Sequence, residues 1–392
     1  MKRNRILHLR ASNFVGGPER QILRHANSQR NGPWEILIGA FRDPQLECEL
    51  LDTIESLGLE GLSLPSNKLR QPVSALIDII RKRQIGLLCT HGYKADIIGV
   101  LAGRLAQVPV ACFLRGWTGE TWKVRVYERI DAWCLRYADR IVCLSQSQAH
   151  RISHRPSIAG KIRVVINAID AQICDAKTRA EARSRLRSRL QLPADCRVVA
   201  TAGRLSPEKG VSDFLTAISL ISDRSPDVKF VVFGHGAMRK QLELQADGLR
   251  IRDAVMFAGF HKDLQELLPG IDVLVNPSLS EEMPNILLEA MAASIPVVAT
   301  SVGAVAEIAG PDRALHLVPP SQPPALADAM RELLAQPEHA AALGHAGFDR
   351  VHSAYSLAAQ RRQFDALYGE FLSPCAESAP PPARLDSIVM PT

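Results

Sequence analysis

Residues 276–307 read NPSLSEEMPNILLEAMAASIPVVATSVGAVAE, which indicates the end of a strand, a polar loop, a short helix and a second strand. Pro284 suits the first turn of a helix, where its missing N–H costs nothing, so we expect the helix to start near Pro284 and to run to Ala293. The helix is apolar on nearly every side, which predicts burial. Its one carboxylate, Glu289, therefore needs a polar partner.

Short apolar runs alternate with helical patterns on both sides of this stretch. In the first half, strands are predicted at 6–9, 35–40, 85–90, 108–114 and 140–144, separated by helices at 19–29, 73–82, 95–106 and 126–137. After the basic stretch 177–189, strands are predicted at 198–202, 228–233, 255–257, 273–276 and 297–300. This alternation is typical of parallel, doubly wound α/β sheets. We expect two Rossmann-like domains that face each other across a cleft, with ligands at the carboxyl ends of the strands.

The domain limits follow from these patterns. We place the first domain at 1–176 and the second at 190–354. Residues 355–372 form a further predicted helix, whose Phe364, Leu367 and Tyr368 recur at helical spacing and so give it a face to bury. The segment 373–392 is rich in Pro, Ser and Ala, and we expect it to be disordered.

Composition excludes several classes of protein. The chain has 392 residues and the content of apolar residues of a globular protein. The basic start has no secretory apolar region after it, and Arg104 and Pro109 interrupt the most apolar window, which argues against a transmembrane helix. The eight cysteines show no metal-binding spacing and are expected to be reduced core residues. We therefore expect a cytoplasmic protein.

Charge divides unevenly along the chain. Residues 1–190 carry 31 Lys and Arg against 17 Asp and Glu, whereas residues 191–392 carry 16 against 24. The basic half favours an anionic partner, with membrane phospholipid, lipid-linked phosphate and nucleic acid as candidates, although a solvated basic surface fits equally well. The aromatic and cationic segment from Trp117 to Tyr127 suits either a membrane interface or packing into the first domain. Nucleic acid ranks last because no aromatic platform or known binding motif is present.

Two segments suggest a phosphate site. The strand 198–202 leads into GRLSPEKG, where Gly203 allows a close approach to a ligand, and Arg204 with Lys209 could hold both phosphates of a nucleoside diphosphate. The start of the central helix also suits phosphate, while the carboxylate of Glu289 suits a sugar hydroxyl. The alternatives are a loop with solvated charges and a core helix whose Glu289 pairs with an Arg.

These motifs resemble the family-four retaining glycosyltransferases of the GT-B architecture, also called group 1. Glu281 and Glu289 match the family's paired glutamates, and Arg204 and Lys209 match its G-R-x-x-x-x-K-G donor motif. Glu282 stands where the family usually has glycine. The resemblance extends over roughly residues 5–371.

The resemblance implies further site residues. In the first domain, Gly16 and Gly17 would lie near the acceptor and the donor phosphates. His91 is expected to contact the sugar because it lies at the carboxyl end of a predicted strand. In the second domain, the implied donor-binding residues are Gly203, Gly234, His261, Leu287, Leu288 and Glu289. The turn at 301–307, with Ala304 in place of the family's second glycine, would support the pocket wall.

The implied activity is retaining transfer of a sugar from a nucleotide diphosphate sugar to a glycan or lipid-linked acceptor, in cell-surface polysaccharide biosynthesis. His91, Arg204, Lys209 and Glu281 would act in catalysis, with Glu281 on the sugar hydroxyls, while Glu289 binds the ribose. No Asp-x-Asp motif is present, so we expect neither a metal nor a cofactor beyond the nucleotide sugar, whose base stays open among UDP, GDP and ADP. The inner face of the cytoplasmic membrane is a second expected location. A sugar-nucleotide epimerase of the same architecture and a catalytically silent sugar-nucleotide-binding subunit are the alternatives.

Overall fold

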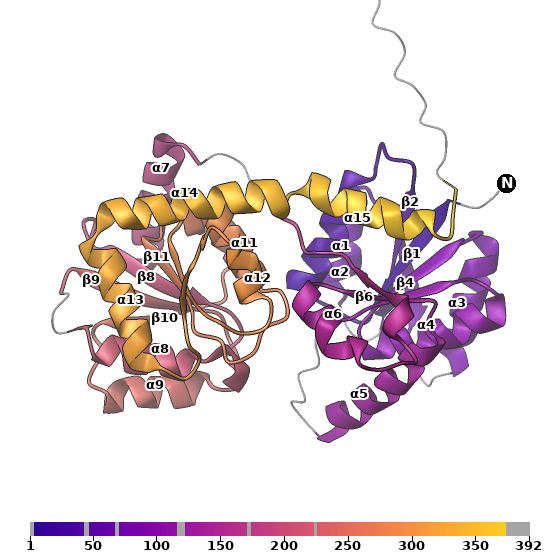
Figure 1. Ribbon diagram of the computed structural model, residues 1–392, viewed down its shortest axis with the longest axis horizontal. Coiled ribbons are helices and arrows are strands. Elements are labelled where there is room, and N and C mark those ends of the chain that lie inside the picture. The colour runs from indigo at the N-terminus through magenta and orange to yellow at the C-terminus, as the bar shows by residue number, and fades with distance from the viewer. Residues whose placement is uncertain are drawn as a thin grey trace, which may run out of the picture.

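A computed structural model describes residues 4–42, 47–66, 70–115, 122–170, 174–222 and 226–373 of the chain, except the side chains of 122–125. The described residues form two sheets of parallel strands, and helices flank each sheet (Figure 1). The predicted fold class, two Rossmann-like α/β domains, is confirmed.

The first sheet has seven parallel strands in the order β3-β2-β1-β4-β5-β6-β7. Its strands are β1 (Arg5–Arg10), β2 (Glu35–Arg42), β3 (Gly61–Pro65), β4 (Leu87–His91), β5 (Val110–Phe113), β6 (Arg140–Cys143) and β7 (Ile162–Val164). Its helices are α1 (Gly17–Ser28), α2 (Glu49–Ser56), α3 (Arg70–Lys82), α4 (Tyr93–Ala106), α5 (Trp122–Cys134) and α6 (Gln146–Ser153). The inner strands are almost wholly buried, because helices cover both faces of a parallel sheet.

The second sheet has six parallel strands in the order β10-β9-β8-β11-β12-β13. Its strands are β8 (Arg197–Ala202), β9 (Val228–Phe233), β10 (Val255–Gly259), β11 (Val273–Asn276), β12 (Val297–Thr300) and β13 (His316–Val318). The remaining helices are α7 (Ala176–Leu190), α8 (Val211–Ser219), α9 (Arg239–Gly248), α10 (Leu264–Leu267), α11 (Asn285–Ala292), α12 (Val305–Ala309), α13 (Pro323–Ala335), α14 (Pro337–Ala354) and α15 (Leu357–Gly369).

Three strands that we did not predict, β3, β7 and β13, lie at the edges of the sheets. β7 and β13 are three residues long, and β3 buries only Leu64 fully. An edge strand is covered less than an inner one, so it needs fewer apolar residues and leaves a weaker pattern in the sequence.

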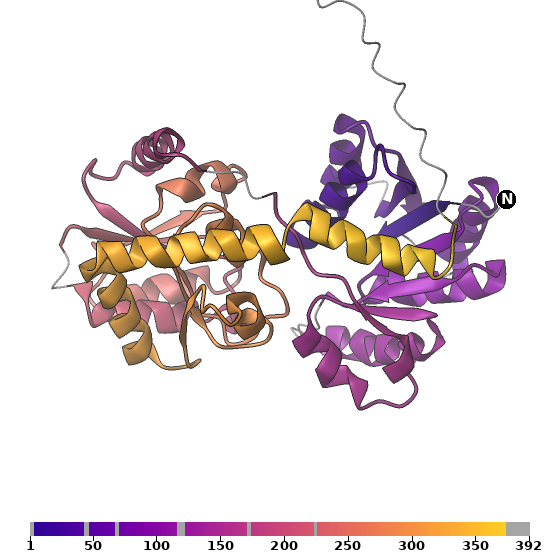
Figure 2. The same ribbon diagram turned by 45° about the horizontal axis from the view of Figure 1, so that its top comes forward.

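The last two helices connect the domains. α14 lies along the second domain, and α15 continues over the first, beside α1 (Figures 1 and 2). Phe364, Leu367 and Tyr368 of α15 are buried in the same apolar cluster as Ile6 and Trp34 of the first domain. The domain limits stay predictions, and the expected disordered tail lies, from residue 374 onward, outside the described residues.

The described cysteines are free thiols, and all of them except Cys174 are buried. None of the described helices is long and apolar enough to cross a membrane.

Candidate functional site

The central helix α11 begins one residue later than predicted. Pro284 has an extended conformation, with φ −73° and ψ 112°, and precedes the first helical residue, Asn285. The helix buries its apolar body as expected. Leu287 and Leu288 are 0% and 1% exposed, so their side chains belong to the core and only their backbone could reach a ligand. Their donor-binding role stays a prediction.

The two motifs that carry the predicted chemistry meet in space. Lys209 Nζ lies 2.7 Å from Glu281 Oε1, although 72 residues separate them in the chain. They come together because β8 and β11 are neighbours in the sheet, so the loops at their carboxyl ends adjoin. Glu281 is 8% exposed and also accepts a hydrogen bond of 2.7 Å from the Ser278 hydroxyl. A partly buried lysine and carboxylate thus hold each other at this edge of the second sheet.

Arg204 lies in the loop after β8 with an exposed side chain. The glycines of this region serve contacts between the loops themselves. Gly234 has φ 120°, and a Cβ on it would lie 1.8 Å from the carbonyl oxygen of Gly203. Glycine is therefore required where these two loops touch, whether or not a ligand approaches. The donor contacts of Gly203 and Gly234 stay predictions.

The loop that carries Glu281 and the turn after β12 both tolerate their departures from the family pattern. Glu282 does not lie in the left-handed region, so glycine is not needed there, and Ala304 has φ −87°. Gly303 by contrast has φ 54°, and a Cβ on it would meet the Glu281 carbonyl oxygen at 1.6 Å. Gly303 therefore lets the turn after β12 pack against the backbone of Glu281.

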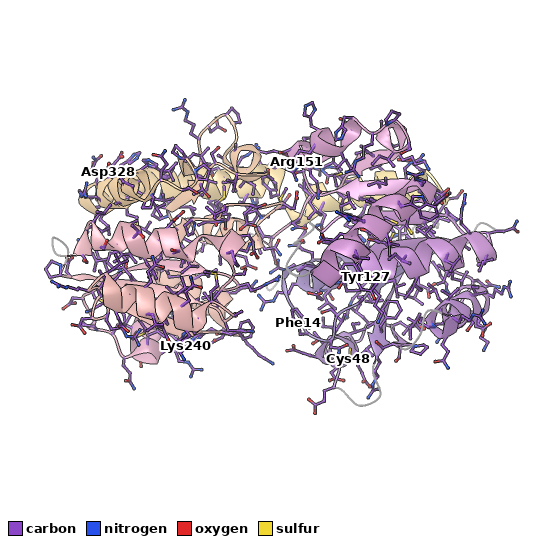
Figure 3. All side chains as sticks on the ribbon, turned by 90° about the horizontal axis from the view of Figure 1, so that it is seen from below. Phe14, Cys48, Tyr127, Arg151, Lys240 and Asp328 are labelled. Carbon is purple, nitrogen blue, oxygen red and sulfur yellow. The ribbon has the colours of Figure 1, made fainter. Side chains whose placement is uncertain are left out.

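Two carboxylates of the second domain bind α6 of the first. Glu282 forms an ion pair with Arg151, which lies near the boundary between the domains (Figure 3). Burial raises the pKa of Glu282, while Arg151 acts in the opposite direction. Glu307 accepts hydrogen bonds from the backbone N–H groups of Gln146 and Ser147 at 3.2 and 3.1 Å. Glu307 thus meets the partial positive charge of the helix N-terminus, and Glu282 pairs with a side chain in the last turn of the same helix. Both contacts hold the second domain against α6.

Glu289 has the polar partner that its burial demands. Gln265 donates a hydrogen bond to Glu289 Oε1 at 2.6 Å, and Arg24 of the first domain lies 3.8 Å from the same oxygen. Glu289 lines an open pocket of about 470 Å³ together with Arg24, Asp170 and Gln265. The residue thus faces both an arginine and a cavity. Its role toward a ribose stays a prediction.

His261 lies just beyond β10, near the carboxyl edge of the second sheet. Its side chain is 12% exposed, its Nδ1 lies 3.5 Å from Asp263, and its ring packs edge-on against Phe233. The position is compatible with a ligand at this edge, and the base contact stays a prediction.

Asn285 connects the start of α11 to the first domain. Its Oδ1 accepts hydrogen bonds from Asn167 at 2.8 Å and from Gln21 at 3.2 Å. Gly17 lies so close that a Cβ on it would come 2.7 Å from Asn285 Nδ2. The predicted loop of Gly16 and Gly17 therefore lies against the central helix. Asn285 could not be predicted as a contact between the domains, because its partners lie 118 and 264 residues away.

His91 is fully buried at the end of β4, and both of its ring nitrogens are engaged. Arg115 contacts Nδ1 at 3.3 and 3.2 Å, and His8 Nδ1 lies 2.9 Å from Nε2. An arginine side chain only donates, so Nδ1 accepts and the proton of the neutral ring is on Nε2. Burial, followed by Arg115, holds the pKa of His91 well below its usual value. Contact of Nδ1 with a sugar would require Arg115 to move, and this role stays a prediction.

The hydrogen bonds continue from His91 to α15 in one direction. His8 accepts from His91, so its own proton is on Nε2, which donates to the Tyr368 hydroxyl at 2.8 Å. Tyr368 in turn donates to His25 Nε2 at 2.8 Å. Burial lowers the pKa of His8 to about 3 and that of His25 well below its usual value. The three histidines are thus neutral in the folded protein at pH 7.

The described residues contain one group of side chains that could together ligate a metal, namely His316, Glu332 and His339. It involves the first residue of β13 and helices α13 and α14, whereas the loops of Lys209 and Glu281 follow the carboxyl ends of strands. This group is therefore not part of the candidate site.

Two sequence families match the chain in turn. Glycosyltransferase Family 4 matches residues 15–173, and Glycosyl transferases group 1 matches residues 182–350.

Proteins with similarity over most of the chain include two enzymes. The UDP-Gal:alpha-D-GlcNAc-diphosphoundecaprenol alpha-1,3-galactosyltransferase of Escherichia coli is 25% identical over 76% of this chain and 79% of its own length. The 2-deoxystreptamine N-acetyl-D-glucosaminyltransferase of Streptomyces fradiae is 29% identical over 88% of this chain and 92% of its own length. The crystal structure of Anabaena HepE in complex with UDP-glucose has a TM-score of 0.80 at 20% identity, covering 93% of this chain and 99% of that one. The structural similarity shows a shared fold.

Proposed function

This chain belongs to the group 1 glycosyltransferases of the GT-B architecture, and we propose that it transfers a sugar from a nucleotide diphosphate sugar to a glycan or lipid-linked acceptor with retention of configuration. The observation that carries this proposal is the contact between Lys209 and Glu281 at 2.7 Å. It joins the two predicted donor motifs at the edge of the sheet where ligands of open α/β folds bind. We further propose cell-surface polysaccharide biosynthesis as the role.

The departing nucleoside diphosphate needs positive charge around it. Arg204, Lys209 and the N-terminus of α11 would supply that charge, so we propose that the reaction needs no metal and no cofactor beyond the nucleotide sugar. Lys209 is held by Glu281 before the donor arrives, which keeps its ammonium in place. Preorganised charge of this kind stabilises a transition state without a cost of reorganisation.

The two glutamates would divide the donor between them. Glu281, beside Lys209, would accept hydrogen bonds from the sugar hydroxyls. Glu289 would accept from the ribose in the pocket that it lines, where Gln265 orients it. In the transfer, the bond from the anomeric carbon to the diphosphate oxygen breaks with its electron pair on the diphosphate. The acceptor oxygen bonds to that carbon on the same face, and its proton passes to the leaving phosphate.

The first domain would supply the acceptor side and close the site. Asn285 already contacts Gln21 and Asn167, so the central helix α11 meets the first domain at its first residue. Gly16 and Gly17 would pass near the donor phosphates from this side. His91 would contact the sugar after Arg115 shifts away from its Nδ1.

An exposed apolar surface on the first domain suggests a membrane-bound acceptor. Leu101 and Leu105 of α4 are 41% and 59% exposed, and Ile130 and Trp133 of α5 are 42% and 51% exposed. The two helices adjoin, and Tyr127, which Figure 3 labels on α5, is also exposed. The guanidinium of Arg136 lies over the Trp133 ring at 5.8 Å. Apolar side chains with nearby cations suit an anionic membrane interface. We propose the cytoplasm as the location, with peripheral attachment to the inner face of the cytoplasmic membrane.

Titration calorimetry with UDP, GDP and ADP sugars tests the donor assignment. Donor turnover should then depend on a lipid-linked or glycan acceptor, NMR of the product should show the donor's anomeric configuration, and EDTA should leave the rate unchanged. Conversion of the donor sugar without an acceptor would identify an epimerase instead. Tight binding without any turnover across the acceptor panel would favour a silent binding subunit.

Flotation with liposomes tests the membrane assignment. The protein should float with anionic vesicles and less with neutral ones, since each cation near such a surface contributes ~1 kcal/mol. Replacing Leu105, Ile130 and Trp133 with Ser should abolish flotation. The matched control is Leu244→Ser on α9, which removes a residue of 62% exposure from the second domain. Equal flotation of both variants would exclude this surface as the contact.

A further inference from the structure

Arg115 follows β5 at the edge of the first sheet that faces the second domain, and every described polar contact of its guanidinium is with a neutral group. Its Nε and Nη2 contact His91 Nδ1, and its Nη1 donates to Asn167 Oδ1 at 3.1 Å. The guanidinium also lies 5.8 Å from the centre of the Phe113 ring. Among the described residues, Arg115 forms no ion pair, because no carboxylate oxygen lies within 4.0 Å of it.

The two carboxylates whose charges act on Arg115, Glu19 and Asp96, have other partners. Glu19 binds the guanidinium of Arg10 at 2.6 Å and the backbone N–H of Gly16 at 3.0 Å. Asp96 accepts from the Thr90 hydroxyl, and burial, followed by the charge of Asp131, raises its pKa well above the usual value. Neither carboxylate therefore forms an ion pair with Arg115.

Burial of this cation is costly for the fold. Burial lowers the pKa of Arg115 to about 9, and the nearby charge of Arg10 also lowers it. The charges of Glu19 and Asp96 raise the pKa, but they do not offset the effect of burial. A partly buried charge without an ionic partner destabilises the folded state. Such groups are retained mainly at functional sites, where a ligand supplies the missing charge.

The surroundings hold the guanidinium in a fixed orientation. Behind it, His91 is fixed by the chain of hydrogen bonds to His8 and Tyr368. In front, Asn167 Nδ2 donates to Asn285 Oδ1 at 2.8 Å and to the carbonyl oxygen of Met283 at 3.3 Å. Asn167 thus links Arg115 to Asn285, the first residue of α11. Part of the surface of Arg115 remains exposed.

We propose that Arg115 binds a phosphate group of a substrate and is the first domain's counterpart of Arg204 and Lys209. This inference rests on the proposed function, because that function brings phosphate to this edge of the sheet. A guanidinium presents paired N–H donors that match phosphate oxygens. The phosphate belongs either to the donor's diphosphate or to the acceptor, and the experiment separates these sources.

Arg115→Met removes the charge and keeps an unbranched apolar side chain, while Arg115→Lys keeps the charge without the paired donors. The matched control is Arg83→Met, which removes an exposed arginine that pairs with Glu60 at 2.8 Å in the same domain. Without ligand, the thermal midpoint of Arg115→Met should stay close to that of the wild type, because loss of an unpaired cation offsets loss of its hydrogen bonds to His91 and Asn167. A residue with a structural role alone would show a clearly lowered midpoint.

Binding of inorganic pyrophosphate to the full chain is the direct test. Arg115→Met should weaken it by about 10- to 100-fold, the range for loss of a charge-assisted hydrogen bond, with Arg115→Lys in between and Arg83→Met unchanged. If the donor supplies the phosphate, affinity for UDP, GDP or ADP falls by the same factor. If the acceptor supplies it, that affinity is unchanged and KM rises only for a phosphate-bearing acceptor.

Normal pyrophosphate affinity in Arg115→Met, together with a lowered thermal midpoint, would overturn the inference and make Arg115 a structural residue. A wild-type protein that transfers no sugar would instead refute the proposed function. The pyrophosphate measurement needs neither a sugar nor an acceptor, so it still decides the role of Arg115.

Discussion

The three buried histidines of the first domain should make the protein lose stability as the pH falls below neutrality. Each has a folded pKa below its unfolded value, which for His8 is lowered from 6.5 to about 3. A histidine of this kind stabilises the fold while it is neutral in both states, above pH 6.5. As the pH falls, the unfolded chain takes up protons that the folded chain does not, and this stability is lost.

The size of the loss follows from proton linkage. Between pH 7.5 and 5.5, one histidine that protonates only in the unfolded state lowers the free energy of unfolding by about 1.4 kcal/mol. If His8, His25 and His91 all remain neutral in the folded protein, the total is about 4 kcal/mol. This is a large part of the ~5 to 15 kcal/mol by which proteins are usually stable.

Urea unfolding at the two pH values measures this loss. The four tryptophans, Trp34, Trp117, Trp122 and Trp133, all lie in the first domain, so their fluorescence reports on the relevant half of the chain. His25→Leu removes one of the three groups and should reduce the loss by about a third. The control is Ile38→Val, which changes the apolar cluster that contains Tyr368 but removes no titratable group. It should lower stability equally at both pH values. A loss in the wild type below about 1.5 kcal/mol, or an unchanged loss in His25→Leu, would refute the neutral histidine chain.

Three further predictions concern the candidate site. Arg204→Ala and Lys209→Ala should leave the protein folded and lower turnover by ~10²-fold or more, and near-normal rates at saturating donor would exclude both from the diphosphate site. Glu289→Gln should weaken calorimetric binding of the nucleoside diphosphate, whereas Glu281→Gln should preserve that binding and impair transfer; equal weakening by both would disprove the division of roles. Glu282→Gly breaks an ion pair whose Glu282 side chain is 26% exposed, so it should change stability by less than about 1 kcal/mol while small-angle scattering shows more separated domains.

The sequence predicted the parts of the fold that carry strong local patterns. The inner strands were found because both of their faces are buried, which leaves continuous apolar runs such as Val228–Phe233. The two motifs that carry Lys209 and Glu281 could be assigned to one pocket by recognising them and placing both at carboxyl ends of strands, whereas the direct contact of the two side chains was not predicted. Neither step required knowledge of distant contacts.

The connections between the domains could not be predicted in this way. Asn285 and Asn167 are ordinary polar residues in their local sequence, and only the tertiary fold brings them within 2.8 Å. His91 was assigned to a sugar because it is a polar residue at the end of a strand. Its burial depends on His8 and Arg115, which lie 83 and 24 residues away. Glu282 looked like a disturbance of a glycine turn until the structure showed its partner, Arg151.

The placement of α15 in the core of the first domain affects how the protein is made on the ribosome. Tyr368 bonds to His8, 360 residues earlier in the chain, and shares an apolar cluster with Ile6 and Trp34. The first domain therefore leaves the ribosome with part of its core uncovered, and this core is completed only when α15 has been synthesised. At ~5 to 20 residues per second, synthesis of the intervening second domain takes roughly 10 to 40 s. During this interval the uncovered cluster would be a natural site for chaperone binding, and a nascent chain stalled before Leu357 should be more sensitive to protease in its first domain than the finished protein.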